Sequence, residues 1–262
     1  MCRLLACLSN DATALSRYTL KTPHSLERQA YAPEEMLSGV VNADGFGVGW
    51  YADNKADDGE PAVYRSLNPI WSDTTFHGIA PKIRSRAYFA ALRNATPPLP
   101  SELAAVPPFS SGRNLFMHNG AVDDFRETVM RPMRASLSDK RYRGITGASD
   151  SETIFALVLD RLDNESSPKD ALLDAVGFIE SMCRDYGTKA TLNLALTDGE
   201  EMVFVRYSTA GATNSLYYLE GEGSALVASE RLDDDGRWRE VSGGSVVLVG
   251  RDRRVSVEAV PF

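Results

Sequence analysis

The residue with the most distinctive chemistry in the sequence is Cys2, which directly follows the initiator methionine. A small second residue favours removal of Met1, and removal leaves a thiol and a free α-amine on one residue. An α-amine has an ordinary pKa of about 7.7–8.0, so near neutral pH it can take the thiol proton and later protonate a departing amine. Cys2 is therefore a candidate nucleophile that carries its own base. The alternative is a small core residue, the more common role of a cysteine in an apolar segment.

Other residues that often carry chemistry are few, since the chain has three cysteines and three histidines. Cys7 and Cys183 lie in the apolar patterns of a strand and a helix, so we expect them to be structural. The histidines are scattered, and the sequence has no zinc-ligand cluster, P-loop, dinucleotide-binding or serine-hydrolase motif. We therefore predict neither a metal nor an organic cofactor.

A nucleophile at residue 2 has to be held by the segments around it, and the first half of the chain predicts mainly strands. Apolar and alternating runs indicate strands at residues 2–8, 42–52, 62–65, 85–92 and 113–118, of which the second and third form a hairpin. The last of these strands is predicted to stop at Asn119–Gly120, because this dipeptide is typical of a sharp turn.

Two helices and further strands follow in the second half. Ser149 to Glu152 form a capping-box pattern ahead of apolar residues at helical spacing. Ser167–Pro168 predict the start of a second helix, and Gly187 predicts its end. The remaining strands are predicted at residues 190–197, 202–207, 215–219, 224–229 and 245–249, as one continuing sheet.

The order of these elements predicts one α+β domain over residues 1–262, with layers of sheets and helices. The chain is 43% hydrophobic and 24% charged, which is typical of a globular protein with a sizeable core. Its formal net charge of -8 argues against a general nucleic-acid-binding protein, which usually has a basic face.

Neither a membrane span nor an export signal is indicated. No apolar stretch approaches the roughly 20 residues that cross a bilayer, and the apolar run at the amino terminus is too short for a secretory signal. Free cysteines without an export signal predict a reducing, cytoplasmic environment. The sequence leaves both a monomer and a homo-oligomer open.

Five motifs occur together in one order: Cys2, NADGFGVGW at 42–50, LRNAT at 92–96, HNG at 118–120 and SDSE at 149–152. In this order and spacing the chain resembles the class II glutamine amidotransferases, a family of N-terminal-nucleophile hydrolases. The resemblance implies a four-layer αββα fold. It also implies a thiol that attacks a γ-glutamyl amide, forms an acyl-thioester and releases glutamate after attack by water.

Further motifs indicate a narrower resemblance. HSLERQAYAP at 24–33, SLNPIWSD at 66–73, PPF at 107–109 and ASERL at 228–232 are similar to the stand-alone hydrolases of ergothioneine biosynthesis. Those enzymes remove glutamate from γ-glutamyl hercynylcysteine sulfoxide, so a small γ-glutamyl substrate is implied. Two alternatives stay open: a glutaminase subunit that passes ammonia to a separate synthase, and an inactive binding scaffold on the same fold.

The resemblance implies roles for the HNG motif. Asn119 and Gly120 match the oxyanion hole, in which the Asn119 side-chain amide and the Gly120 backbone N–H donate to the developing negative charge. His118 is expected to orient this segment rather than to act as the base. Considered alone, an Asn–Gly pair is more often simply a turn.

The resemblance also implies how the glutamyl end of a substrate is bound. Arg93 matches the residue that binds the α-carboxylate, Thr96 an accompanying contact, and Asp150 the residue that binds the α-ammonium. A guanidinium suits a carboxylate because it forms two parallel hydrogen bonds. Asp44 and Gly45 match a segment near the nucleophile, where we expect a backbone role with glycine supplying an unusual φ. Considered alone, Arg93 is a solvated strand end and Asp150 is part of a helix start.

Overall fold

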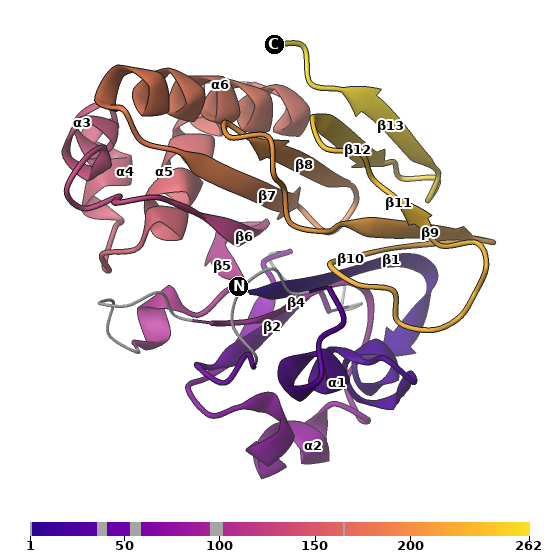
Figure 1. The fold of residues 1–262 in the computed structure, drawn as a ribbon. Coiled ribbons are helices and arrows are strands. Elements are labelled where there is room, and N and C mark those ends of the chain that lie inside the picture. Colours follow the sequence, from indigo (N-terminus) through magenta and orange to yellow (C-terminus); the bar gives the residue numbers. More distant parts are fainter. Residues whose placement is uncertain (1, 36–40, 53–58, 95–101, 165) are drawn as a thin grey trace.

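Two antiparallel sheets form the centre of the molecule (Figure 1). The structure, a computed structural model, describes residues 2–35, 41–52, 59–94, 102–164 and 166–262. The first sheet has the order β11-β9-β10-β1-β4-β2-β3 and consists of β1 (Arg3–Ala14), β2 (Phe46–Trp50), β3 (Ala62–Ser66), β4 (Arg84–Leu92), β9 (Tyr217–Gly221), β10 (Ser224–Ala228) and β11 (Arg239–Glu240). The second has the order β13-β12-β8-β7-β6-β5 and consists of β5 (Phe109–Ser111), β6 (Asn114–Val122), β7 (Ala190–Thr197), β8 (Met202–Ser208), β12 (Ser245–Val249) and β13 (Val255–Ala259).

Helices cover the outer face of each sheet (Figure 1). The second sheet is covered by α5 (Asp150–Asp163) and α6 (Pro168–Tyr186), with the short α3 (Met130–Ala135) and α4 (Asp139–Arg143) beside α5. The first sheet is covered by α1 (Leu26–Tyr31) and α2 (Thr74–Ile79). Short helical turns lie at Arg17–Lys21, Ile70–Ser72 and Leu103–Ala105.

Three apolar clusters fill the spaces between these layers. One contains Ile154 of α5 and residues of β7 and β8. The second lies between the two sheets and contains Leu4 of β1 and Phe204 of β8. The third contains Leu5 of β1 and Phe76 of α2. The layers therefore follow the order helix, sheet, sheet, helix, which confirms the predicted four-layer αββα fold.

Strand β1 lies in an inner layer and is buried on both faces. Leu4, Ala6 and Leu8 belong to the cluster between the sheets. Leu5 and Cys7 belong to the cluster under α1 and α2. Burial on both sides explains why residues 4–8 of this strand form a continuous apolar run rather than an alternating pattern. Each of its leucines stabilises the fold by roughly 1.5–3 kcal/mol through burial.

The boundaries predicted for α6 are confirmed. Ser167 accepts a hydrogen bond from the backbone N–H of Asp170 at 3.1 Å, and Pro168 occupies the first turn. Gly187 ends the helix in the left-handed conformation with φ 67°. Glycine adopts this conformation without the steric cost that other residues meet.

The cap of α5 is confirmed in part. The Ser149 hydroxyl accepts from the backbone N–H of Glu152 at 3.2 Å, as a capping box predicts. The Glu152 carboxylate instead accepts from the backbone N–H groups of Thr146 and Gly147, each at 2.6 Å. Glu152 therefore fixes the segment that leads into α5 rather than closing the box.

The turn predicted at Asn119–Gly120 is wrong. Strand β6 continues to Val122, and the two residues pair with Asn193 and Leu192 of β7. An Asn–Gly pair favours a turn only where no neighbouring strand engages its backbone, and here β7 does so. Asn119 and Gly120 therefore lie within a sheet.

The single sheet predicted for the second half is also wrong. Strands β7 and β8 form the expected hairpin, with Gly199 at φ 91° in its turn. Strands β9 and β10, however, join the first sheet, where Ala228 of β10 pairs with Leu5 of β1. Strand β12 then returns to β8 in the second sheet. After β8 the chain thus crosses between the sheets twice, and the first of these crossings brings the ASERL segment to the start of β1.

Helices α1 to α4 and strands β5, β11 and β13 were not predicted. Each is six residues or shorter, so it presents too few positions for a helical or alternating pattern to emerge. In the part of the chain that the structure describes, no helix is both long and apolar enough to cross a membrane.

Candidate active site

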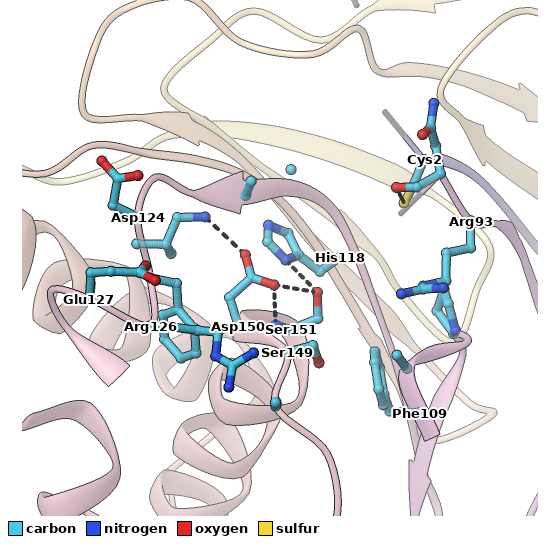
Figure 2. A pocket seen from close by; sticks show the side chains of 18 residues that line it. Cys2, Arg93, Phe109, His118, Asp124, Arg126, Glu127, Ser149, Asp150 and Ser151 are labelled. Carbon is cyan, nitrogen blue, oxygen red and sulfur yellow. Dashed lines mark hydrogen bonds between the residues drawn. The ribbon is translucent and has the colours of Figure 1, made fainter. Parts of the chain in front are cut away.

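One pocket brings together most of the residues predicted for the site (Figure 2). Its lining includes Cys2, Arg93, His118, Gly120 and Asp150. These residues come from the ends of β1 and β4, from β6 and from the first turn of α5. Figure 2 shows Cys2 and Arg93 toward one end of the pocket and a group of charged side chains, Asp124, Arg126 and Glu127, toward the other.

Cys2 is the cysteine that is open to this pocket. It precedes β1, and its thiol lies 3.9 Å from the carbonyl oxygen of Asn94. Cys7 and Cys183 are buried in the core. Burial raises the pKa of Cys7 to about 12 and that of Cys183 to about 11, so both stay protonated and inert near neutral pH. Cys2 is thus the thiol placed to meet a substrate.

Arg93 follows the last residue of β4 and is almost fully buried, with 5% of its surface exposed. Its backbone N–H donates to the Gly45 carbonyl at 2.8 Å, and its own carbonyl accepts from the Asp44 N–H at 3.2 Å. Gly45 has φ 107°, and a Cβ there would lie 2.6 Å from the Ser66 carbonyl oxygen. The backbone role predicted for this segment is confirmed, since only glycine fits this conformation and this approach.

Asn119 lies beside the pocket, fully buried between the two sheets. Its side-chain oxygen accepts from the Asn214 amide at 3.2 Å, which directs its amide nitrogen toward Ser229 Oγ at 3.2 Å. The same Ser229 hydroxyl accepts from the Leu4 backbone N–H at 3.0 Å. The Asn119 amide is therefore locked in an orientation that faces the first residues of β1.

Gly120 lies where two strands approach closely. A Cβ at this position would be 1.8 Å from the carbonyl oxygen of Thr191 on β7 and 2.7 Å from His118 Nε2. The Thr191 carbonyl belongs to the main chain and cannot withdraw without opening the β6–β7 pair. Glycine is thus required here for packing, independently of any role of its N–H.

The substitution Gly120→Ala is expected to lower the free energy of unfolding by about 3 kcal/mol, at the upper end of the usual cost of overpacking. Gly78→Ala in α2 is the matched control, because no heavy atom of the described residues lies within 4 Å of the added methyl. A small gain of up to about 1 kcal/mol is expected for that control. Chemical denaturation followed by circular dichroism measures both, and equal midpoints would contradict the packing role.

His118 is held between β7 and α5. Its Nε2 lies 3.1 Å from the Thr191 carbonyl oxygen, and its Nδ1 lies 2.9 Å from Ser151 Oγ. A carbonyl only accepts, so we assign the proton to Nε2, and Nδ1 then accepts from the Ser151 hydroxyl. Both ring nitrogens are engaged, which is the arrangement expected of a residue that orients its surroundings.

Asp150 is the first residue of α5, and its carboxylate is fixed by the backbone. One oxygen accepts from the Val122 N–H at 2.9 Å, and the other accepts from the Ser151 N–H at 2.7 Å. These bonds join the end of β6 to the start of α5. The carboxylate therefore reaches the pocket in a set orientation, in keeping with its local alternative as part of a helix start.

Thr96 lies outside the described residues. Among the residues that are described, no group of three or more His, Cys, Asp and Glu side chains is arranged to hold a metal ion. The pocket thus offers a thiol, an imidazole, guanidinium groups, carboxylates and backbone amides.

Several contacts near Cys2 involve residues that no sequence motif identified as part of the site. Arg3 is fully buried and donates from Nη1 to the Cys2 carbonyl at 3.0 Å and from Nε to Glu230 at 2.6 Å. Ser229 and Asn214 orient Asn119. The ASERL motif contains Ser229 and Glu230, but nothing in the sequence indicates that they contact residues near position 2.

A family model described as glutamine amidotransferases class II matches residues 1–222. The chain belongs to this family. A relative from Mycobacterium tuberculosis named gamma-glutamyl-hercynylcysteine sulfoxide hydrolase is 35% identical over 250 residues, which cover 95% of this chain and 93% of that protein. The family resemblance predicted from the five motifs is confirmed.

Two solved structures share the fold of this chain. A class II domain protein from Silicibacter pomeroyi has a TM-score of 0.72 at 25% identity, with 99% of this chain and 100% of that chain covered. The phosphoribosylpyrophosphate amidotransferase of Bacillus subtilis has a TM-score of 0.69 at 14% identity, and the match covers 99% of this chain and 49% of that longer one. The second similarity extends to the fold alone.

Proposed function

We propose that this class II amidotransferase hydrolyses a γ-glutamyl amide, with Cys2 as the nucleophile. The thiol attacks the amide carbon, its proton passes to the α-amine left by removal of Met1, and that amine protonates the departing amine. Water then attacks the resulting thioester, which releases glutamate and restores the thiol. The observation that carries this proposal is the single pocket that Cys2 shares with Arg93 and Asp150.

The glutamyl end of the substrate is oriented by two opposite charges. The Arg93 guanidinium forms two parallel hydrogen bonds with the α-carboxylate, and the Asp150 carboxylate accepts from the α-ammonium. The family resemblance assigns an accompanying contact at the carboxylate end to Thr96. Fixing both groups on the α-carbon places the γ-carbonyl toward Cys2, and positioning of this kind contributes a large part of a catalysed rate.

The oxyanion that forms on thioester formation needs donors. A side-chain amide has two N–H groups, and the contact of Asn119 with Ser229 uses one. The second N–H of Asn119 and the backbone N–H of Gly120 are the donors we propose. Because neighbouring side chains already fix Asn119, this donor does not have to reorganise during the reaction.

For the leaving group, we propose the substrate named for the mycobacterial relative, γ-glutamyl hercynylcysteine sulfoxide. The test compares kcat/KM for γ-glutamyl thioether-sulfoxide conjugates with kcat/KM for free glutamine, with glutamate release as the readout. A clear preference for the conjugates is expected. A preference for glutamine, increased by a partner protein, would instead indicate a glutaminase subunit, and binding without turnover of either would indicate an inactive scaffold.

Arg93→Lys is expected to raise KM by roughly 10- to 100-fold with a smaller change in kcat, because the point charge of an ammonium replaces a bidentate hydrogen-bond donor. Arg143→Lys is the matched control, since the Arg143 side chain is 76% exposed and pairs with Asp139 one turn away. Steady-state kinetics on a γ-glutamyl conjugate distinguish the two variants. A fall in kcat at unchanged KM would contradict the binding role of Arg93.

A further inference from the structure

A buried ion pair lies directly behind the nucleophile. The side chains of Arg3 and Glu230 are 0% and 1% exposed, and Arg3 Nε lies 2.6 Å from Glu230 Oε1. The other end of the guanidinium donates from Nη1 to the Cys2 carbonyl oxygen at 3.0 Å. One cation therefore connects the Glu230 carboxylate to the main chain of Cys2.

The Glu230 carboxylate accepts hydrogen bonds from several segments of the chain. Besides Arg3, it accepts from His24 Nε2 at 2.6 Å and from the backbone N–H groups of Glu34 at 2.8 Å and Glu35 at 3.3 Å. Burial alone would raise the pKa of the Glu230 carboxyl. The bonds from His24 and the backbone, together with the Arg3 charge, outweigh burial and lower that pKa below its usual value. Glu230 is thus an anion that closes a network around the start of β1.

Cys2 needs such an anchor because the sheet does not hold it. Pairing of β1 with β4 begins at Arg3, opposite Leu92, and pairing with β10 begins at Leu5. Cys2 precedes both ladders, so its main chain lacks the restraint of a strand residue. A nucleophile displaced by about 1 Å reacts roughly 10²-fold more slowly, so a fixed main chain matters for the rate.

The pair also determines the net charge next to Cys2. A buried ion pair is weak evidence for a stabilising role, since a well-packed apolar pair of similar volume often serves stability as well or better. An Arg3 cation without Glu230 would favour the thiolate of Cys2 and disfavour a protonated amine on the same residue. Both forms are needed in turn during acyl transfer, so neutralising this cation serves the chemistry.

We propose that Glu230, acting through Arg3, is a positioning residue that fixes the main chain of Cys2 and neutralises the charge behind it. The proposal rests on the proposed function, because it takes Cys2 as the nucleophile. It assigns to the Arg of the amino-terminal segment and the Glu of the ASERL segment one shared task, performed by residues 227 positions apart.

The charged and titratable groups around Cys2 come from both sides of it. Behind it are Arg3, His24, Glu34, Glu35 and Glu230. On the pocket side are Arg93, His118, Asp124, Arg126, Glu127 and Asp150. Substitutions at Glu230 leave the pocket side intact, so a changed pH response of Cys2 reports on the network behind it.

The first variant is Glu230→Gln, which keeps the shape and removes the charge. We expect kcat on a γ-glutamyl conjugate to fall by roughly 10²-fold with KM changed less than about threefold. We also expect the pH midpoint of Cys2 alkylation by iodoacetamide, followed by peptide mass spectrometry, to move to lower pH. Buried Cys7 and Cys183 serve as internal references in the same digests.

A double variant separates the effect of position from that of charge. Arg3→Gln, Glu230→Gln buries no net charge, so the alkylation midpoint is expected to return toward that of the unaltered protein while kcat stays low. This variant also carries the test if Glu230→Gln alone does not fold. Glu240→Gln is the matched control, because Glu240 pairs with Arg206 at 3.0 Å away from the pocket and is 58% exposed; both its kcat and its midpoint are expected to stay unchanged.

The proposal is overturned if folded Glu230→Gln, or the folded double variant, keeps the kcat of the unaltered protein, or if the single variant shows no shift of the alkylation midpoint. Alkylation requires no turnover, so this readout is independent of the substrate. Failure of the proposed function would appear differently, as activity that persists after Cys2 itself is replaced.

Discussion

Replacement of Cys2 by alanine is expected to abolish turnover, with kcat falling by on the order of 10⁶-fold, as for loss of the nucleophile in other acyl-transfer enzymes. No second thiol can substitute, because Cys7 and Cys183 are buried and their pKa values are raised to about 12 and 11. Arg93 and Asp150 stay in place in this variant. Substrate binding is therefore expected to persist, and calorimetric titration with a γ-glutamyl conjugate measures it.

Two observations complete the test of the nucleophile. Cys183→Ala is the control, because it removes a thiol from the core and is expected to leave kcat unchanged. Mass spectrometry of the active protein is expected to show that Met1 is absent, since the α-amine of Cys2 is the proposed base. Undiminished activity of Cys2→Ala, or full activity in protein that keeps Met1, would end this mechanism.

Asn119→Ala is expected to lower kcat by roughly 10²- to 10³-fold with little change in KM, because an oxyanion donor acts chiefly in the transition state. The substitution also leaves the buried amide of Asn214 without one acceptor, which costs about 1–3 kcal/mol of stability. Kinetics are therefore measured well below the melting temperature of the variant.

Ser229→Ala is the matched variant for this prediction. It removes the acceptor at 3.2 Å that orients the Asn119 amide but leaves the donor itself. A smaller loss of kcat is expected than for Asn119→Ala. If Asn119→Ala raises KM and leaves kcat intact, Asn119 binds the ground state and is not an oxyanion donor.

Elements with strong local signals were predictable from the sequence. Helices α5 and α6 begin at Ser caps and are long enough for an apolar face to recur, and α6 ends at a glycine in the left-handed conformation. The first part of strand β1 was predictable because residues 4–8 form a continuous apolar run. The placement of β9 and β10 was not, because the pairing of Leu5 with Ala228 joins distant parts of the chain and leaves no local signal.

The same distinction between local signals and long-range contacts applies to the residues of the site. The motifs predicted Cys2, Arg93, His118, Gly120 and Asp150, and the structure places them on one pocket. The local preference of Asn–Gly for a turn gave the wrong conformation, because the strand β7 engages that backbone. The contact of Arg3 with Glu230 depends on the crossing of the chain between the two sheets, which only the fold reveals.

The burial of β1 on both faces has a consequence for changes of chain length. Each residue of a strand advances the chain by about 3.3 Å and reverses the direction of the side chain. One residue inserted or deleted between Cys2 and Leu4 would therefore either carry the thiol away from Arg93 or turn the apolar residues of β1 toward the wrong layers. The amino-terminal end of a protein usually tolerates such edits well. In this protein the number of residues between Cys2 and Leu4 is set by the nucleophile on one side and by the core on the other.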